Sequence, residues 1–230
     1  ITKKEDAVRR CTNEGYECEK IAIEKIKHFV SKEAFNIDGL GKKIVENFWD
    51  LKLIRFPQDI FNLNYNKIEK LEGWGKLSVT NLQFSIEQKK IVSLEKFIYS
   101  LGIRHIGQEN AKLIARHLKT PVNFFKLSNN KNIEILSNID GIGVTQVQSI
   151  KKFFVNKKNV KILSELNKDL VIESFILVDN EGLLKNKTFM LTGKLNEISR
   201  AEAKSLIEKN SGKIINNVNK KLDFLIAGEK

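Results

Sequence analysis

Hydrophobic residues recur in four similar segments of the chain, each centred on a glycine. The four glycines are Gly41, Gly75, Gly107 and Gly143, spaced 34, 32 and 36 residues apart. In every copy a hydrophobic residue precedes the glycine, another lies four residues before it, and apolar residues follow four and seven positions after it. Because the last two positions fall on one face of a helix, each copy predicts a helix that begins just after its glycine.

Another glycine lies two residues earlier in three of the four copies. Gly39, Gly73 and Gly141 hold this position, and His105 replaces it in the third copy. Glycines on both sides of a hydrophobic residue permit a tight reversal between two helices, because glycine adopts backbone conformations that other residues rarely adopt. The pattern therefore predicts four helix-hairpin-helix elements. A helical repeat whose glycines serve packing alone is the alternative.

The second helix of each predicted element begins with backbone N–H groups that have no partner inside the helix. Such groups can bind phosphate, and a glycine at this point lets a DNA strand come close to the backbone. Contacts of this kind hold duplex DNA without reading its base sequence. We therefore expect DNA contacts from the hairpin glycines and from the cationic side chains beside them, namely Gly39, Gly41, Lys42, Gly73, Gly75, Lys76, Arg104, Gly107, Gly141 and Gly143.

The two prolines of the chain mark a second level of duplication. Pro57 lies between the first and second copies and Pro121 between the third and fourth, in similar segments at residues 56–61 and 120–125. Proline favours the first turn of a helix. The sequence therefore predicts two pairs of hairpins, each pair joined by a short connecting helix.

The charge of the chain adds a candidate partner. Its formal net charge is +12, and residues 183–230 carry ten Lys or Arg against five Asp or Glu, so the positive excess is spread along the chain. Cations that displace counterions from phosphates drive sequence-independent binding to nucleic acid. A lysine-rich surface that only faces solvent is the alternative. There is no apolar run near 18 residues, so the sequence predicts no membrane span.

Cys11 and Cys18 are the only cysteines, and six residues separate them. A structural zinc site normally has four ligands, often supplied as two pairs of cysteines. The two thiols therefore fit either half of a metal site or two incidental cysteines. The chain begins at Ile1 without an initiator methionine. We therefore treat the chain as a fragment whose second ligand pair would lie upstream.

The hydrophobic pattern changes near residue 183. Residues 187–191 predict a buried strand, Ser199 and Glu202 form a capping box before a helix, and Gly212 is expected as the C-terminal cap of that helix. Residues 213–218 and 222–227 predict two more strands. This order indicates part of a small α/β domain with a parallel sheet. Thr192 and Gly193, after the first strand, fit either a phosphate site or a plain turn.

These motifs together resemble bacterial NAD-dependent DNA ligase and its terminal BRCT domain. The resemblance rests on the cysteine segment 10–18 and on segments 28–32, 38–41, 100–107, 140–143, 190–193, 199–204 and 225–229. It implies a mainly α chain: residues 1–20 as the C-terminal half of a zinc-binding element, residues 21–175 as a tandem helix-hairpin-helix domain, and residues 183–230 as a truncated BRCT-like α/β domain. It also implies that Cys11 and Cys18 are zinc ligands.

The resemblance further implies a role in sealing nicks in duplex DNA. In the family, NAD adenylates a lysine of a Lys-x-Asp-Gly motif, and magnesium assists the transfer of the adenylate. That motif is absent here, because both Asp-Gly pairs follow Asn36 or Asn138 two residues earlier. We therefore expect no catalytic residue in this chain and predict a cytoplasmic monomer that clamps nicked duplex DNA regardless of sequence. The alternatives are a non-enzymatic DNA-repair scaffold, part of a structure-specific nuclease and a phosphopeptide-binding module.

Overall fold

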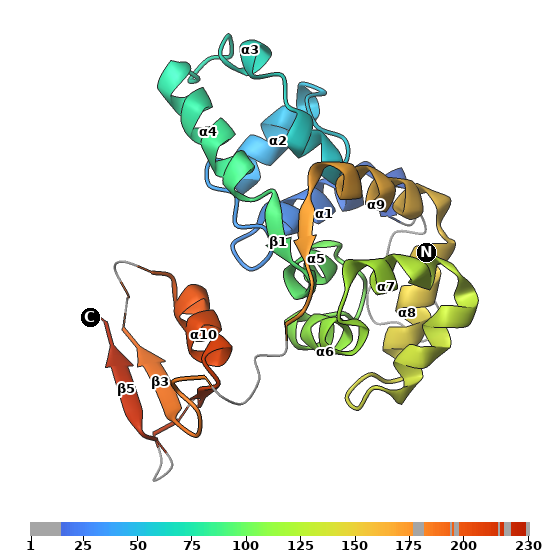
Figure 1. Ribbon diagram of the computed structural model, residues 1–230. Helices are drawn as coiled ribbons and strands as arrows, with labels where there is room; N and C mark the ends of the chain where they lie inside the picture. The colour runs from blue at the N-terminus through green and yellow to red at the C-terminus, as the bar shows by residue number, and fades with distance from the viewer. Residues whose placement is uncertain are drawn as a thin grey trace, which may run out of the picture. The chain divides into compact units, whose positions relative to one another are not determined.

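The computed structural model describes residues 15–176, 182–193, 195, 198–215, 217–218 and 222–228. The chain forms two compact units, Ile1–Phe175 and Ile176–Lys230, and each is described by itself. The first unit is almost entirely helical, whereas the second is a small sheet with a helix (Figure 1). The predicted fold class, a mainly α chain with a small α/β part at its C-terminal end, is therefore confirmed. No helix within the described ranges is long and apolar enough to cross a membrane.

The helices of the first unit follow the predicted repeat. The four that begin directly after the repeated glycines are α2 (Lys42–Asp50), α4 (Lys76–Gln88), α6 (Gln108–Leu118) and α8 (Val144–Val155). The helices that precede the hairpins are α1 (Glu19–Val30), α3 (Tyr65–Ile68), α5 (Leu94–Ser100) and the 3-10 helix η4 (Asn130–Asn138). The unit also contains η1 (Gly15–Glu17), η3 (Lys126–Ser128) and α9 (Lys157–Asp169).

Each proline begins a short connecting helix, as the sequence predicts. Pro57 opens the 3-10 helix η2 (Pro57–Asn62), and Pro121 opens α7 (Pro121–Phe125). The carboxylate of Asp59 accepts hydrogen bonds from the backbone N–H groups of Arg55 and Phe56 at 2.8 and 2.9 Å, which fixes the start of η2. At α7 the roles are reversed, because the hydroxyl of the N-cap residue Thr120 accepts a bond from the backbone N–H of Asn123.

Both pairs of hairpins share one hydrophobic core, which extends from Ala22 in α1 to Leu170 after α9. Helix α9 contacts both η2, the connector of the first pair, and α8 in the second pair. The side-chain amide of Asn62 in η2 donates a hydrogen bond of 2.8 Å to the Asp169 carboxylate at the end of α9. The last long helix of the unit therefore joins the two pairs.

A two-stranded parallel sheet, which the hydrophobic pattern did not predict, also joins distant parts of the first unit. Strands β1 (Ile91–Ser93) and β2 (Val171–Glu173) pair with Ile91 opposite Val171. Beyond β2, the backbone N–H of Phe175 donates to the carbonyl of Lys119 at 2.7 Å. Each strand has three residues, too few to show an alternation of polar and apolar positions.

The second unit has the predicted order of strand, helix, strand and strand. Its parallel sheet has the strand order β4-β3-β5, with the first strand of the unit in the middle. The Asp223 carboxylate accepts bonds from the backbone N–H and the hydroxyl of Thr188, and these bonds hold the pKa of Asp223 below its usual value. The elements are β3 (Thr188–Thr192), α10 (Arg200–Lys209), β4 (Lys213–Ile214) and β5 (Phe224–Ala227).

The two ends of α10 differ in how well the sequence predicts them. The Ser199–Glu202 capping box is present as predicted. At the other end Ser211, with φ of 67°, takes the left-handed conformation that we expected of Gly212. Gly212 follows it and donates its N–H to the carbonyl of Ile207 at 2.9 Å, which completes a Schellman motif. Glycine is needed there for space, because an added Cβ would lie 2.6 Å from the Ile207 side chain.

Phe124 tests the shared core of the second pair. Its ring is fully buried and lies 5.5 Å from the ring of Phe154 and 6.1 Å from that of Phe97, between centroids. We expect Phe124→Ala to lower the free energy of unfolding by about 3–5 kcal/mol, because it removes this burial and leaves a cavity. Urea unfolding followed by circular dichroism measures the loss. Phe84→Ala on α4, where the side chain is exposed, is the control and should change stability little.

Candidate nucleic-acid interface

The same backbone turn reverses the chain in all four hairpins. The N–H of the hydrophobic residue between the two repeat positions donates to the carbonyl three residues earlier. These bonds measure 3.3 Å for Leu40, 3.1 Å for Trp74, 3.0 Å for Ile106 and 3.0 Å for Ile142. The third residue of a turn of this kind takes a positive φ when the turn is of type II.

The earlier of the two repeat positions, here called the first, is the third residue of this turn. Its φ is 88° at Gly39, 78° at Gly73 and 86° at Gly141, and it is 63° at His105. His105 therefore adopts the same left-handed conformation as the glycines and does not break the third hairpin. The Asn110 side chain donates a hydrogen bond of 3.0 Å to the carbonyl of His105 and so supports this conformation. Left-handed φ costs a residue with a Cβ about 1–2 kcal/mol.

The space around the first position divides the hairpins into two kinds. An added Cβ at Gly39 would lie 3.3 Å from the Leu82 side chain of α4, and one at Gly141 would lie 2.9 Å from the Leu113 side chain of α6. In each pair, therefore, one hairpin packs its first glycine against the second helix of the other hairpin. At Gly73 no atom lies within 4 Å of an added Cβ.

The later repeat glycine, here called the second, needs neither a positive φ nor the absence of a side chain for packing. Gly41, Gly75, Gly107 and Gly143 are the N-caps of α2, α4, α6 and α8, with φ between −64° and −121°. No side chain caps any of these four helices. An added Cβ at Gly41, Gly75 or Gly107 would meet no atom within 4 Å, and at Gly143 it would meet only the Gln146 side chain at 3.2 Å. The start of each helix is thus open to an outside molecule.

Buried side chains hold each open turn in place. Leu40, Ile106 and Ile142 between the repeat positions are buried, and Trp74 is partly buried and packs on Phe48. The residues four and seven positions after the second glycine are buried in all four helices, as the sequence predicts: Val45, Val79, Ala111 and Val147, then Phe48, Leu82, Ile114 and Ile150.

The charged side chains at the turns distinguish the third hairpin. Lys42 and Lys76 are exposed at the first residue of α2 and α4. The residue three positions before the second glycine is acidic in three hairpins, namely Asp38, Glu72 and Asp140, whereas in the third it is the exposed Arg104. The third hairpin therefore presents Arg104 beside His105 where the others present a carboxylate beside a glycine. The pattern of glycines alone did not reveal this difference.

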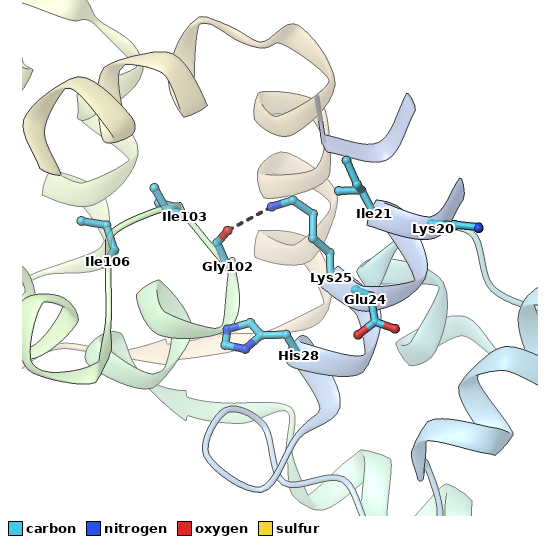
Figure 2. Close-up of a pocket in the computed structure, with 8 residues that line it drawn as sticks. All are labelled: Lys20, Ile21, Glu24, Lys25, His28, Gly102, Ile103 and Ile106. Carbon is cyan, nitrogen blue, oxygen red and sulfur yellow. Dashed lines mark hydrogen bonds between the residues drawn. The ribbon is translucent and has the colours of Figure 1, made fainter. Parts of the chain in front are cut away.

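Helix α1 fixes the third hairpin from a distance in sequence. The ammonium group of Lys25 donates to the carbonyl of Gly102 at 3.1 Å, and Nε2 of His28 donates to the carbonyl of Tyr99 at 2.8 Å. Figure 2 shows Lys25 reaching from α1 to this carbonyl at the edge of a hollow of about 530 Å³. Burial lowers the pKa of Lys25. These contacts set the position of the third hairpin relative to the first, and the sequence did not predict them.

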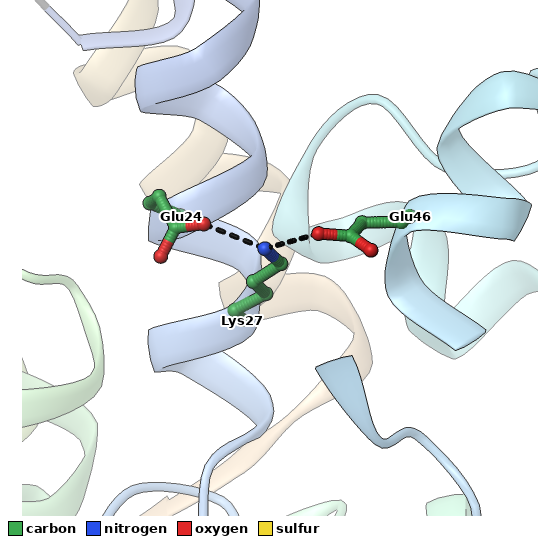
Figure 3. A network of polar contacts seen from close by, with 3 residues as sticks. All are labelled: Glu24, Lys27 and Glu46. Carbon is green, nitrogen blue, oxygen red and sulfur yellow. Dashed lines mark hydrogen bonds and ion pairs between the residues drawn. The ribbon is translucent and has the colours of Figure 1, made fainter. Parts of the chain in front are cut away.

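A lysine between two carboxylates joins α1 to α2 across the first hairpin. Nζ of Lys27 lies 2.6 Å from Oε1 of Glu24 on α1 and 2.6 Å from Oε1 of Glu46 on α2 (Figure 3). The hydrogen bonds to Glu24 and Glu46 raise the pKa of Lys27. The two carboxylates face solvent, whereas the Lys27 side chain is only 11% exposed. Ion pairs with such solvated partners contribute little stability. Their effect is to orient the two helices of the hairpin.

The expected zinc ligands are only partly described. Cys11 lies outside the described residues, and Cys18 is the half-buried N-cap of α1, whose carbonyl accepts a bond of 2.8 Å from Ala22. Within the part of the chain that the structure describes, no three His, Cys, Asp or Glu side chains gather as a metal site would require. Zinc binding by Cys11 and Cys18 therefore stays a prediction.

Comparison with known proteins agrees with this geometry. Residues 96–163 match the model of the helix-hairpin-helix motif, and residues 179–230 match that of the BRCA1 C Terminus (BRCT) domain. The DNA ligase of Pelagibacter ubique (strain HTCC1062) is 80% identical over 229 residues, and that of Rickettsia bellii (strain OSU 85-389) is 42% identical over 237 residues. These alignments cover 100% and 98% of this chain but 34% of each relative.

The chain thus carries a match to the helix-hairpin-helix motif and, after it, a match to the BRCT domain. It is a homologue of bacterial DNA ligases, as the resemblance of its motifs predicted, and it spans about a third of the length of the curated relatives it matches.

Two glycine substitutions test whether packing against a partner helix restricts the first turn position. Gly73→Ala should lose about 1–2 kcal/mol of unfolding free energy, because φ is positive there and the Cβ has space. Gly141→Ala should lose about 1 kcal/mol more, because its Cβ would also press on Leu113. Denaturant titrations of both variants measure the difference. Equal losses would contradict this reading of the Leu113 contact.

Proposed function

We propose that this chain is the DNA-binding portion of an NAD-dependent DNA ligase and that it holds nicked duplex DNA through the phosphates of both strands. The second repeat glycines carry this proposal. At Gly41, Gly75 and Gly107 neither backbone conformation nor space requires glycine. Serine, aspartate or asparagine would cap the helix better. Glycine offers one advantage there, the unobstructed approach of a ligand to the helix N-terminus.

The chemistry of a helix N-terminus indicates the kind of ligand. Its first N–H groups have no partner within the helix, and the helix dipole adds partial positive charge, so the site favours an anion. The net charge of +12 favours a polyanion. Four such sites in one unit support binding to successive phosphates of DNA, a contact that carries no sequence information.

Holding the duplex is the contribution we assign to this chain in nick sealing. Alignment of the two ends of a nick can supply much of the rate of phosphoryl transfer. The chain contains no Lys-x-Asp-Gly motif. We therefore assign adenylation, with its NAD and magnesium, to another part of the enzyme, and expect the isolated chain to be an inactive monomer. Cys11 and Cys18 would supply two ligands of a zinc site in this cytoplasmic enzyme.

Gly75→Asp separates the DNA contact from the stability of the fold. Aspartate at this N-cap should stabilise α4 by about 0.5–1 kcal/mol relative to glycine, because its carboxylate caps the helix and complements its dipole. The same carboxylate would occupy the phosphate position, so duplex affinity should fall at least about tenfold. Thermal unfolding and fluorescence anisotropy with a labelled duplex measure the two effects.

Gln83→Glu, at an exposed position of the same helix, adds one negative charge and is the matched control. It should bind duplex DNA nearly as the parent chain does. If Gly75→Asp binds as tightly as Gln83→Glu, the helix N-terminus of the second hairpin does not contact phosphate, and the assignment of the hairpins to DNA is wrong.

The salt dependence of binding tests sequence independence. Duplexes of unrelated sequence should bind equally, and the logarithm of the association constant should fall linearly with the logarithm of salt concentration, by about 0.9 per phosphate contacted. Anisotropy titrations with intact and nicked duplexes over a salt series measure this slope. A strong preference for one base sequence, or binding that does not weaken with salt, would contradict backbone recognition.

A further inference from the structure

A cleft lies between the third hairpin and helix α8. It has a volume of about 600 Å³. Arg104 and His105 of the hairpin lie on one side, Thr145, Ser149 and Lys152 of α8 lie on the other, and Lys25 of α1 lines it as well. The residues from α8 are three or four positions apart, so they form one continuous face of that helix. The cleft is separate from the glycines of the fourth hairpin, which border another hollow.

The charged side chains that the structure describes along this cleft are all basic. Among the described residues that line it, Lys25, Arg104 and Lys152 are basic and none is Asp or Glu. The nearby Glu24 borders the neighbouring hollow and is bonded to Lys27. Cations that line a cleft together raise the local concentration of anions there.

Lys25 gives the cleft a second property of an anion site. Its ammonium group is part-buried, donates a hydrogen bond of 3.1 Å to the carbonyl of Gly102 and lies 5.8 Å from the centroid of the Tyr16 ring. Burial lowers its pKa, because desolvation disfavours the charged form. An anion in the cleft would stabilise that charged form.

We propose that this cleft is a phosphate site built from side chains and that it holds a backbone phosphate of the strand that contacts the third hairpin. The inference rests on the proposed function and deepens it. Whereas the hairpins present backbone N–H groups, the cleft presents ammonium and guanidinium groups, and arginine binds phosphate in a bidentate fashion. Arg104 belongs both to the third hairpin and to the cleft, so a strand that leaves the hairpin passes directly along α8.

Two neighbouring lysines of α8 provide the test. Lys152 lines the cleft, whereas Lys151 does not line it and lies 3.8 Å from the carboxylate of Glu134, between Nζ and Oε1. Lys152→Gln and Lys151→Gln remove the same charge from the same helix. We expect Lys152→Gln to weaken duplex binding by roughly five- to tenfold at about 0.1 M salt and to lower the salt slope by about 0.9, and Lys151→Gln to do neither.

Fluorescence anisotropy with one labelled duplex, across a salt series, measures both quantities, and circular dichroism verifies the fold of each variant. Equal slopes for the two variants would overturn the cleft proposal while the parent chain still binds DNA, so this failure is distinct from that of the proposed function. Calorimetry with inorganic pyrophosphate separates the sources of phosphate. Pyrophosphate binding that Lys152→Gln abolishes, with duplex binding unchanged, would show a site for a free anion and overturn the assignment to the DNA strand.

Discussion

The hydrogen bond that closes each hairpin turn sets the direction of the four helices that follow. It joins the N–H of the hydrophobic residue between the two repeat positions, here called the plug residue (Ile106 in the third hairpin), to the carbonyl three residues earlier. The residue before the plug takes a positive φ, as in a type II turn. The plug side chain is then directed into the core, and the next residue is left at the surface as a helix N-cap. A buried hydrophobic residue and an open helix start are therefore two results of one turn.

The two repeat positions in each turn have different physical roles. The first position takes the positive φ of the turn. His105 shows that an exposed residue other than glycine can do so when Asn110 bonds to its carbonyl. The second position has ordinary φ and open space at Gly41, Gly75 and Gly107. The fold accounts for the first set of glycines. It does not require glycine at Gly41, Gly75 or Gly107, and this is why we propose that a ligand approaches these helix starts.

Helix α1 and the third hairpin show how the two pairs cooperate. Lys25 and His28 bond to backbone carbonyls more than 70 residues further along the chain, so the hairpins are held within one rigid core. The same lysine lines the cleft beside α8. One part-buried side chain thus links the arrangement of the hairpins to the basic surface that we assign to phosphate.

The sequence by itself determined the number of hairpins, the start of each second helix, the connecting helices at Pro57 and Pro121, and the order of elements in the second unit. All of these depend on local backbone preference and helical periodicity, which short segments carry. Only the tertiary structure decided the pairing of β1 with β2, the bond from Lys25 to Gly102, the left-handed conformation of Ser211 in place of Gly212, and the convergence of Arg104 and Lys152 on one cleft. Three of these four depend on residues far apart in the chain. At the end of α10, Ser211 takes the positive φ that glycine usually takes, and Gly212 is needed instead for its close packing against Ile207.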